Sequence, residues 1–311
     1  MPVDEGLFEK KDWDDLLWFI RKGICTPFIG AGASYPFLPL GGELANDWAD
    51  RFNYPLKDSM DLPKVAQFMA IDHFEMHPKY RIAEEFQNKI RQKSPDFLQK
   101  DEPHAVLADL NLPIYVTTNY DNFMFDALKT RNRDKAPKRD TCSWSLPVEN
   151  ILKIKGIKPV LGSSYKPSAD KPVVYHLHGY LEVPETMVLT ENDYLDFMIR
   201  LQEKEDPILP PAITIAVTTH ALLFVGYSLA DWNFRVLFRS LFGSLSSMSN
   251  LIVAVQLRPK EVKNEEDAIK YLGKYFASVL GKSTNLKVRV YWGEATEFAV
   301  ELRKHWESAT Q

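Results

Sequence analysis

The stretch Phe28-Ile29-Gly30-Ala31-Gly32-Ala33-Ser34 places two glycines directly behind a short apolar run. We expect residues 26–29 to form a buried strand and residues 43–52 to form the helix that follows the turn. A strand, a glycine turn and a helix make the first half of a nucleotide-binding unit, in which small residues let the backbone approach a pyrophosphate. The predicted phosphate-binding residues are therefore Gly30, Ala31, Gly32, Ala33 and Ser34, which would use unpaired N–H groups and the helix dipole.

This turn is weak evidence when it stands alone. Tyr35 occupies the place of the third glycine in the ordinary dinucleotide fingerprint. Asp50 has the spacing of the acidic residue that holds a ribose diol, but it lies inside a predicted helix rather than at a strand end. The alternative is a tight turn that binds no ligand, so the rest of the chain must decide between these interpretations.

Further apolar runs predict five more strands, at residues 113–117, 172–177, 222–226, 251–257 and 286–292. Helical patterns separate them, which indicates a Rossmann-like, doubly wound α/β fold with six parallel strands and helices on both faces. We expect a single domain over residues 1–311. It would carry a small helical insertion at about 57–104 and a long excursion at about 131–172, and excursions of that length are often functional.

The composition is that of an ordinary globular protein, with 45% hydrophobic and 26% charged residues and a net charge of −4. Without a basic surplus we expect no direct nucleic-acid binding, and without a long apolar run we expect no membrane insertion. Two cysteines, Cys25 and Cys142, are too few for a four-thiolate zinc site. These features and the absence of a leader pattern favour a reducing cytoplasm.

Polar motifs follow two of the predicted strands. The first is Thr117-Thr118-Asn119-Tyr120-Asp121, in which the Asn119 amide can donate and accept and so suits a water molecule together with a ribose hydroxyl. Asp121 is placed to cap the next helix, with or without a ligand contact. The second is Tyr175-His176-Leu177-His178-Gly179. There we expect His178 to be a proton acceptor near neutral pH, and His176 to be a core histidine.

Two later turns complete the set. Phe224-Val225-Gly226-Tyr227-Ser228 runs into Asp231 and repeats the pattern of strand, glycine turn and helix start, so Gly226, Tyr227, Ser228 and Asp231 are candidates for contacts with sugar and phosphates. Ser228 and Asp231 also have the spacing of a capping box, and Asp231 is more often a cap than a ligand. Glu294 follows the last predicted strand and is a candidate for the adenosine end.

Four motifs occur in the order Gly-Ala-Gly-Ala-Ser, Thr-Thr-Asn-Tyr-Asp, His-Leu-His-Gly and Val-Gly-Tyr-Ser. Together they resemble the Sir2 family, and more closely its Sir2-like branch in bacterial antiphage systems than the protein deacetylases. The resemblance covers residues 26–306 and implies that the glycine turn binds NAD+, with Asn119 and His178 as the catalytic pair. Two features of the deacetylases are missing. The arginine-containing segment after the serine is absent, and the excursion offers one cysteine, Cys142, where they carry four zinc ligands. We therefore expect no zinc and no cofactor beyond NAD+ as substrate.

Without the zinc module that helps to build an acyl-lysine groove, water is the simplest nucleophile, and the resemblance implies an NAD+ glycohydrolase that releases nicotinamide and ADP-ribose. Two alternatives stay open, namely an NAD-dependent protein deacylase or ADP-ribosyltransferase, and a non-catalytic module that binds NAD or ADP-ribose. Sir2-like effectors often work with a sensor domain, an ATPase or a short Argonaute. Because the chain ends soon after its last predicted helix, we expect a homo-oligomer, a separate sensor or ATPase partner, or both.

Overall fold

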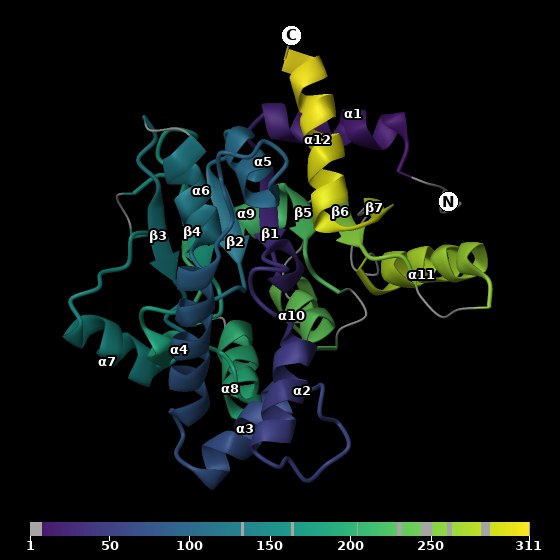
Figure 1. The fold of residues 1–311 in the computed structure, drawn as a ribbon. Coiled ribbons are helices and arrows are strands. Elements are labelled where there is room, and N and C mark those ends of the chain that lie inside the picture. Colours follow the sequence, from purple (N-terminus) through teal and green to yellow (C-terminus); the bar gives the residue numbers. More distant parts are fainter. Residues whose placement is uncertain are drawn as a thin grey trace.

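The computed structural model describes residues 8–131, 134–162, 165–203, 205–228, 232–243, 251–259, 263–280 and 287–310. Within these ranges the chain forms one sheet of seven strands in the order β3-β4-β2-β1-β5-β6-β7, and every neighbouring pair is parallel (Figure 1). The strands are β1 (Cys25–Ile29), β2 (Ile114–Thr117), β3 (Lys138–Thr141), β4 (Val173–His176), β5 (Ala221–Val225), β6 (Leu251–Gln256) and β7 (Lys287–Trp292). The predicted parallel α/β architecture is confirmed.

The predicted number of six strands is wrong because β3 lies inside the excursion. Its sequence, Lys-Arg-Asp-Thr, has no apolar run. Among the described strands it pairs only with β4, from Lys138↔Val173 to Thr141↔His176. An edge strand can be polar, because just one of its sides is covered by a neighbour and its first residues stay partly exposed. The excursion also contains helix α7 (Leu146–Ile154).

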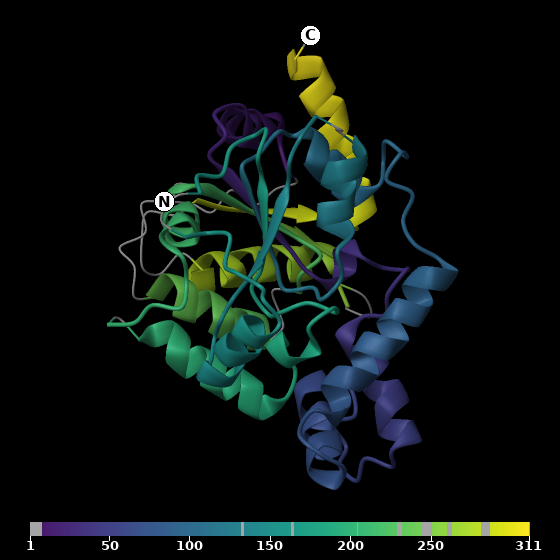
Figure 2. The ribbon, with the colours of Figure 1, turned by 90° about the vertical axis from the view of Figure 1, so that its left-hand side faces the viewer.

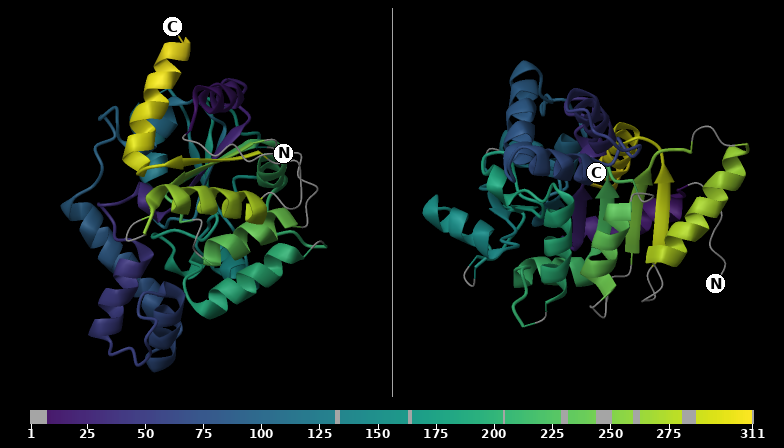
Figure 3. Two further views of the ribbon diagram at one scale, coloured as in Figure 1. Left: turned by 90° about the vertical axis from the view of Figure 1, so that its right-hand side faces the viewer. Right: turned by 90° about the horizontal axis from the view of Figure 1, so that it is seen from below.

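Helices cover both faces of the sheet, as predicted. One face packs against α1 (Lys10–Arg21), α5 (Pro103–Asp109), α6 (Phe123–Arg131) and α12 (Ala295–Thr310). The other packs against α7, α8 (Glu191–Gln202), α9 (Pro211–Thr219), α10 (Trp232–Gly243) and α11 (Glu265–Leu280). Figures 1 and 3 show the two layers on either side of the strands, and the right-hand view of Figure 3 shows neighbouring strands pointing the same way. Because both faces are covered, β1 and β5 are buried along their whole length.

Three helices form a module of their own at one end of the molecule. They are α2 (Gly41–Arg51), α3 (Leu62–Asp72) and α4 (His77–Gln92), and they enclose a separate apolar cluster that contains the fully buried Trp48 and Met69. The same cluster includes Leu181, Met187 and Leu189 of the segment that follows β4. Figure 2 shows this module projecting away from the sheet. No helix in the described ranges is long and apolar enough to cross a membrane.

The strand order creates a switch point at β1. From β1 the chain first builds β2, β3 and β4 on one side and then returns to place β5 on the other. Register pairs Ile29 with Thr117 and with Val225, and Thr117 with His176, so four strands end level with one another. In open parallel sheets a ligand crevice lies at this kind of position. The motifs found in the sequence therefore share one edge of the sheet.

Candidate active site

Two glycine turns pack against each other where β1 and β5 end. Gly30 N donates to Val225 O and Gly32 N donates to Gly226 O, both at 2.9 Å. Gly226 has a φ of +80°, and a Cβ placed there would lie 2.3 Å from Ala33 N and 2.6 Å from Gly30 O. A side chain would therefore meet both strain and a backbone clash. The glycines let the two turns approach backbone to backbone.

This packing uses most of the amides in the first turn. Besides the two bonds above, Ala33 N donates to Gly30 O at 3.0 Å and Ser34 N to Ala31 O at 3.1 Å. Of the amides of residues 30–34, only that of the exposed Ala31 has no acceptor among the described residues. Helix α2 begins at Gly41, well beyond the short 3₁₀ turn η1 (Ala31–Ala33). The expectation of several free amides backed by a helix dipole is therefore wrong, because one amide remains for an anion.

Asn119 lies two residues beyond the end of β2, and 9% of its surface is exposed. Its Nδ2 donates to Gly30 O and to Ser34 Oγ, each at 3.0 Å. A carbonyl oxygen can only accept, so the bond to Gly30 fixes which end of the amide is nitrogen. Both amide hydrogens are used, and Oδ1 has no donor among the described residues. Asn119 thus offers an acceptor to a ligand, not the donor and acceptor together that the sequence suggested.

Ser34 and Asp121 lie behind this amide. Ser34 Oγ donates to Asp121 Oδ2 at 2.9 Å, while Asp121 Oδ1 accepts from Phe123 N at 2.9 Å at the start of α6. The predicted capping role of Asp121 is confirmed, and both side chains are buried. Burial raises the pKa of Asp121, and the charge of His104 opposes that shift. Ser34 contacts the Asn119 side chain directly, and Asp121 contacts it only through Ser34.

Tyr227 joins the ends of three strands. Its hydroxyl donates to Ile29 O at 3.2 Å and lies 2.9 Å from Thr118 Oγ1, and its carbonyl accepts from Gln256 Nε2 at 2.8 Å. Burial raises the pKa of this phenol, so it remains a neutral hydrogen-bonding group. Ser228 follows and is exposed. Asp231 lies outside the described residues.

Glu294 lies farther from the glycine turns, because β6 separates β7 from β5. It is exposed and precedes α12, where its carbonyl accepts from Phe298 N at 3.0 Å and its amide donates to Glu297 Oε2 at 2.8 Å. The neighbouring Gly293 N donates to Gln256 O at 2.7 Å. The hydrogen bonds of Glu294 to described residues therefore belong to the helix start, and none reaches the glycine turns.

His178 lies beyond the end of β4 and is only 4% exposed. Its ring meets the edges of two α8 side chains, Tyr194 at 5.4 Å and Phe197 at 5.1 Å between centroids. Its Nε2 is buried without a hydrogen-bond partner in the described ranges. Burial lowers the pKa of His178 to about 3, so the imidazole is neutral at physiological pH.

His176 has a different task. It is fully buried, and its Nδ1 lies 3.2 Å from the carbonyl oxygen of Asn119. Because that oxygen can only accept, Nδ1 carries the proton. Burial, helped by the charge of Arg139, lowers the pKa of His176 to about 4. The predicted core role is confirmed, and the residue binds the backbone of the Asn119 loop.

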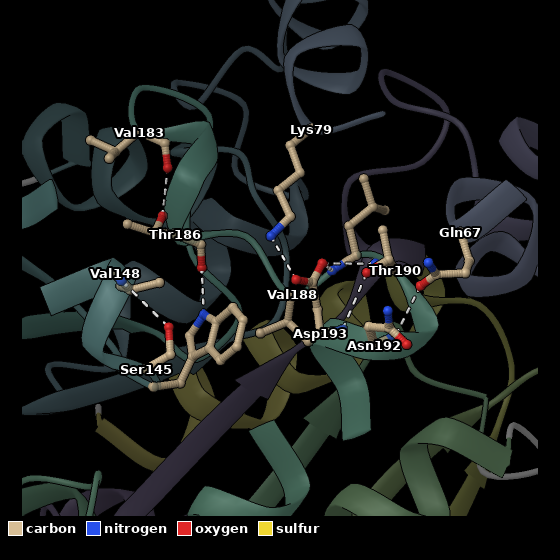
Figure 4. A network of polar contacts seen from close by, with 12 residues as sticks. Gln67, Lys79, Ser145, Val148, Val183, Thr186, Val188, Thr190, Asn192 and Asp193 are labelled. Atoms are coloured by element: carbon tan, nitrogen blue, oxygen red, sulfur yellow. Dashed lines mark hydrogen bonds and ion pairs between the residues drawn. The ribbon is translucent and has the colours of Figure 1, made fainter. Parts of the chain in front are cut away.

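The helix that covers His178 is anchored by the inserted module. Figure 4 shows Lys79 of α4 pointing at Asp193 in the first turn of α8, with 2.7 Å between Nζ and Oδ1. The other oxygen, Oδ2, accepts from the backbone amides of Leu189 and Thr190. One carboxylate therefore caps α8 and ties it to α4. Tyr194, which contacts His178, directly follows Asp193 in this helix.

Sequence reasoning missed Lys79, Glu102 and His104. Glu102 Oε1 lies 2.7 Å from His104 Nδ1, both residues are buried, and the His104 ring meets Phe123 edge-on at 5.8 Å at the start of α6. Glu102 followed by Pro103 is a recognisable helix-start signal. Nothing local in the sequence indicates that this helix start lies behind Asp121, because the contact joins segments that are distant in the chain.

The described part of the chain contains no group of three or more His, Cys, Asp or Glu arranged to hold a metal ion. Cys25 and Cys142 are both free and buried. They belong to the apolar clusters on opposite faces of the sheet. Burial raises the pKa of each thiol to about 12, so neither is a thiolate at neutral pH.

Comparison with known proteins now adds to this geometry. The family model of the SIR2-like domain matches residues 113–280, more than half of the chain. The chain belongs to the SIR2-like family. The matched range of this SIR2-like protein contains Asn119, His178 and the turn at Gly226, whereas the turn at Gly30 precedes it.

Several characterised relatives share part of their length with this SIR2-like chain. NAD(+) hydrolase ThsA of Bacillus cereus (strain MSX-D12) is 27% identical over 210 residues, which are 66% of this chain and 37% of that protein. ThsA of Enterococcus faecium is 24% identical over 69% of this chain and 39% of its own length. Defense-associated sirtuin 2 of Bacillus subtilis is 25% identical over 70% of this chain and 19% of its own length. The chain thus spans well under half of each of these relatives.

Proposed function

We propose that this SIR2-like chain is an NAD+ glycohydrolase that cleaves NAD+ to nicotinamide and ADP-ribose. The observation that carries the proposal is the Asn119 amide, whose two hydrogens are held by Gly30 and Ser34 while Oδ1 is left without a donor in the described ranges. It lies at the switch point, beside the packed glycine turns. The names of the ThsA relatives support the same activity.

The proposed reaction breaks the bond between C1′ of the ribose and the nicotinamide nitrogen. The bonding electron pair leaves with neutral nicotinamide, a water oxygen bonds to C1′, and a proton of that water passes to His178. Asn119 Oδ1 accepts a hydrogen bond from the water or from a ribose hydroxyl, which holds the reactants in place. We assign the pyrophosphate to the Ala31 amide and the surrounding turns, with Tyr227 and Ser228 beside them.

His178 suits this role by its charge state. The ring is neutral without first losing a proton, and its unpartnered Nε2 lacks a hydrogen bond that an entering hydroxyl or water would supply. A ligand oxygen that accepts a hydrogen bond from the protonated ring would also oppose the effect of burial and raise the pKa of His178. Binding of NAD+ would in this way make His178 a better base.

We further propose that the protein is the NAD-depleting effector of an antiphage defence system. The name of the Bacillus subtilis relative, Defense-associated sirtuin 2, supports this context. Unrestrained NAD+ cleavage would harm the host cell, so we propose control by homo-oligomerisation, by a separate sensor or ATPase partner, or by both. Light scattering that finds an active monomer would contradict control by homo-oligomerisation.

A non-catalytic module that binds ADP-ribose is the second candidate. The burial of His178 beneath Tyr194 and Phe197 favours it, because a base with so little exposed surface has limited access to a reacting hydroxyl. This candidate predicts that calorimetry detects binding of ADP-ribose while prolonged incubation leaves NAD+ intact. It also predicts that expression of the protein does not deplete NAD+ in cells.

The test measures nicotinamide release from NAD+ by the full chain, and cellular NAD+ after expression, for the wild type, Asn119→Ala and His178→Ala. We expect each substitution to reduce release about 100-fold or more. The matched controls are Asn150→Ala and His73→Ala, which alter exposed residues and should leave the rate unchanged. A wild type that binds ADP-ribose but depletes no NAD+ supports the module, and a wild type that binds neither overturns both candidates.

A further inference from the structure

An ion pair joins the inserted helical module to α8 in a place that water scarcely reaches. Lys79 Nζ lies 2.7 Å from Asp193 Oδ1, and the two side chains are 5% and 11% exposed. Burying two charges costs hydration, and an apolar pair of similar volume often gives the same stability or more. Apolar packing would not supply direction, however. The same carboxylate accepts from Leu189 N and Thr190 N, so the ion pair ties the start of α8 to one position on α4.

Two further contacts join the same parts of the molecule. Gln67 of α3 accepts from Asn192 N at 3.0 Å (Figure 4), but this hydrogen bond is exposed, where water competes with it. Lys79 Nζ also lies over the ring of Trp144, 5.5 Å from its centroid, and Trp144 Nε1 donates to Thr186 O at 2.9 Å. Lys79 thus lies against both ends of the segment that leads from Thr186 into α8.

This segment and α8 hold His178 from two sides. Val188 N donates to the carbonyl oxygen of His178 at 3.1 Å, and the rings of Tyr194 and Phe197 pack against the imidazole. The imidazole Nε2 has no hydrogen-bond partner in the described ranges, so the position of the ring depends on packing. Tyr194 directly follows Asp193 in α8. A displacement of this first turn would therefore move a side chain that contacts the ring.

We propose that Lys79 is a positioning residue for His178, because its ion pair with Asp193 holds α8 against the imidazole ring. Lys79 acts on the ring through Asp193 and Tyr194, which are neighbours in the first turn of α8. The inserted module thereby contributes to the geometry of the site. The catalytic part of this inference rests on the proposed NAD+ hydrolysis, whereas the placement of the ring does not depend on it.

The test removes both charges at once, by Lys79→Met together with Asp193→Asn. Removal of one partner alone would leave a buried charge unpaired and could unfold the chain. In the double variant the remaining side-chain oxygen can still accept from Leu189 N and Thr190 N, so α8 keeps its cap while its tie to α4 is lost. We expect kcat for nicotinamide release to fall about tenfold with little change in KM.

The matched control is an ion pair of the same form in α1. Asp12, in the first turn of that helix, accepts from Glu9 N through Oδ2, and its Oδ1 lies 2.6 Å from Arg289 Nε of β7. Arg289→Met together with Asp12→Asn therefore also keeps a helix cap and breaks a tie between elements. This variant should leave kcat unchanged. An equal loss of kcat would show that loosening any helix has the same effect, and it would overturn the proposal.

The ring signals of His178 in a 1H–13C spectrum of the histidine-labelled chain provide a readout that does not need turnover. His178→Asn identifies them, and the ring currents of Tyr194 and Phe197 make them sensitive to the position of α8. We expect these signals to shift when the Lys79 pair is replaced, and not in the control. If they shift while the wild type cleaves no NAD+, the proposed function fails and the placement of the ring by Lys79 stands. Unchanged signals, or a shift with unchanged kcat in an active enzyme, overturn the positioning role.

Discussion

The two proposed catalytic residues are held in opposite ways. Asn119 lies among hydrogen bonds, with Gly30, Ser34 and Thr117 contacting its side chain or its backbone amide. His178 lies among apolar rings, and its Nε2 has no partner in the described ranges. The strands that carry them, β2 and β4, are direct neighbours with Thr117 in register with His176. Adjacent strand ends thus provide one polar and one apolar environment.

This difference separates two means of control. Hydrogen bonds fix direction, so the Asn119 side offers one acceptor at a set position. Apolar packing sets the position and the charge state of the His178 ring. The ring is therefore neutral, and its basicity depends on which ligand group binds beside it. Substitutions on the polar side should disturb orientation and stability together, whereas those on the apolar side should chiefly change the chemistry and its dependence on pH.

The largest effect is expected from Asn119→Asp, which has nearly the same shape. A carboxylate cannot donate to Gly30 O or Ser34 Oγ, and it would stand beside the buried charge of Asp121. We expect a loss of about 3 kcal/mol of unfolding free energy. Nicotinamide release should fall about 1000-fold. Urea unfolding measures the unfolding free energy and a release assay measures nicotinamide formation. The control is Asn150→Asp, which alters an exposed residue. Activity within tenfold of wild type would show that the Asn119 donors have no role.

Gly226→Ala should come next, because it separates the two turns on which the polar side is built. A Cβ there meets Ala33 N at 2.3 Å and also requires a positive φ. We expect about 3 kcal/mol of destabilisation and loss of ADP-ribose binding. Gly23→Ala is the matched control, since Gly23 has φ +68° with nothing within 4 Å of an added Cβ. It should cost only about 1 kcal/mol of strain. Equal costs would contradict the packing argument.

The pH dependence of stability tests the apolar side. The pKa of His178 is about 3 and that of His176 about 4, below the value of 6.5 for a free imidazole. Stability from their neutral forms is complete above pH 6.5 and is lost as the pH falls below it. Each ring should contribute a slope of about 1.4 kcal/mol per pH unit. The stability gap between wild type and His178→Asn should therefore shrink from pH 7 to pH 5. A gap that stays constant over this range would contradict the neutral, buried state of the ring.

The site motifs could be recognised in the sequence because the carboxyl ends of parallel strands lie at the same edge of a sheet. Gly30, Asn119, His178 and Gly226 each follow an apolar run, and the pattern alone was enough to place them at one edge. The excursion was expected to hold one short strand or helix at most, and the polar edge strand β3 was not counted in the sheet because an edge strand needs no apolar run. The use of the turn amides was also missed. It depends on how closely Gly226 approaches Gly32, a distance that no local pattern records.

The supporting residues were harder still to predict. Lys79 contacts Asp193, which lies far away in the sequence, and the His104 ring contacts Phe123 of another helix. Each resembles an ordinary polar residue at the start of a helix. The sequence indicated that Asp121 caps α6, but not that Asp121 also takes the Ser34 hydroxyl. Asp121 thus combines a local role at the start of α6 with a contact to a distant segment, and only the fold reveals that second contact.

The smallest effect we expect is that of Phe197→Leu, which changes one wall of the His178 environment. The substitution removes the edge-to-face contact at 5.1 Å but keeps an apolar side chain, so unfolding free energy should fall by about 1 kcal/mol. Phe276→Leu makes the same change in a buried ring of α11 against Trp292 and should lose a similar amount of stability. Only Phe197→Leu should lower kcat, by a few-fold, since of these two phenylalanines only Phe197 contacts His178. Equal kcat values in the two variants would show that packing by α8 does not orient the base. The ring would then have to be directed by the bound ligand, and the contrast between a polar and an apolar means of positioning would fail on its apolar side.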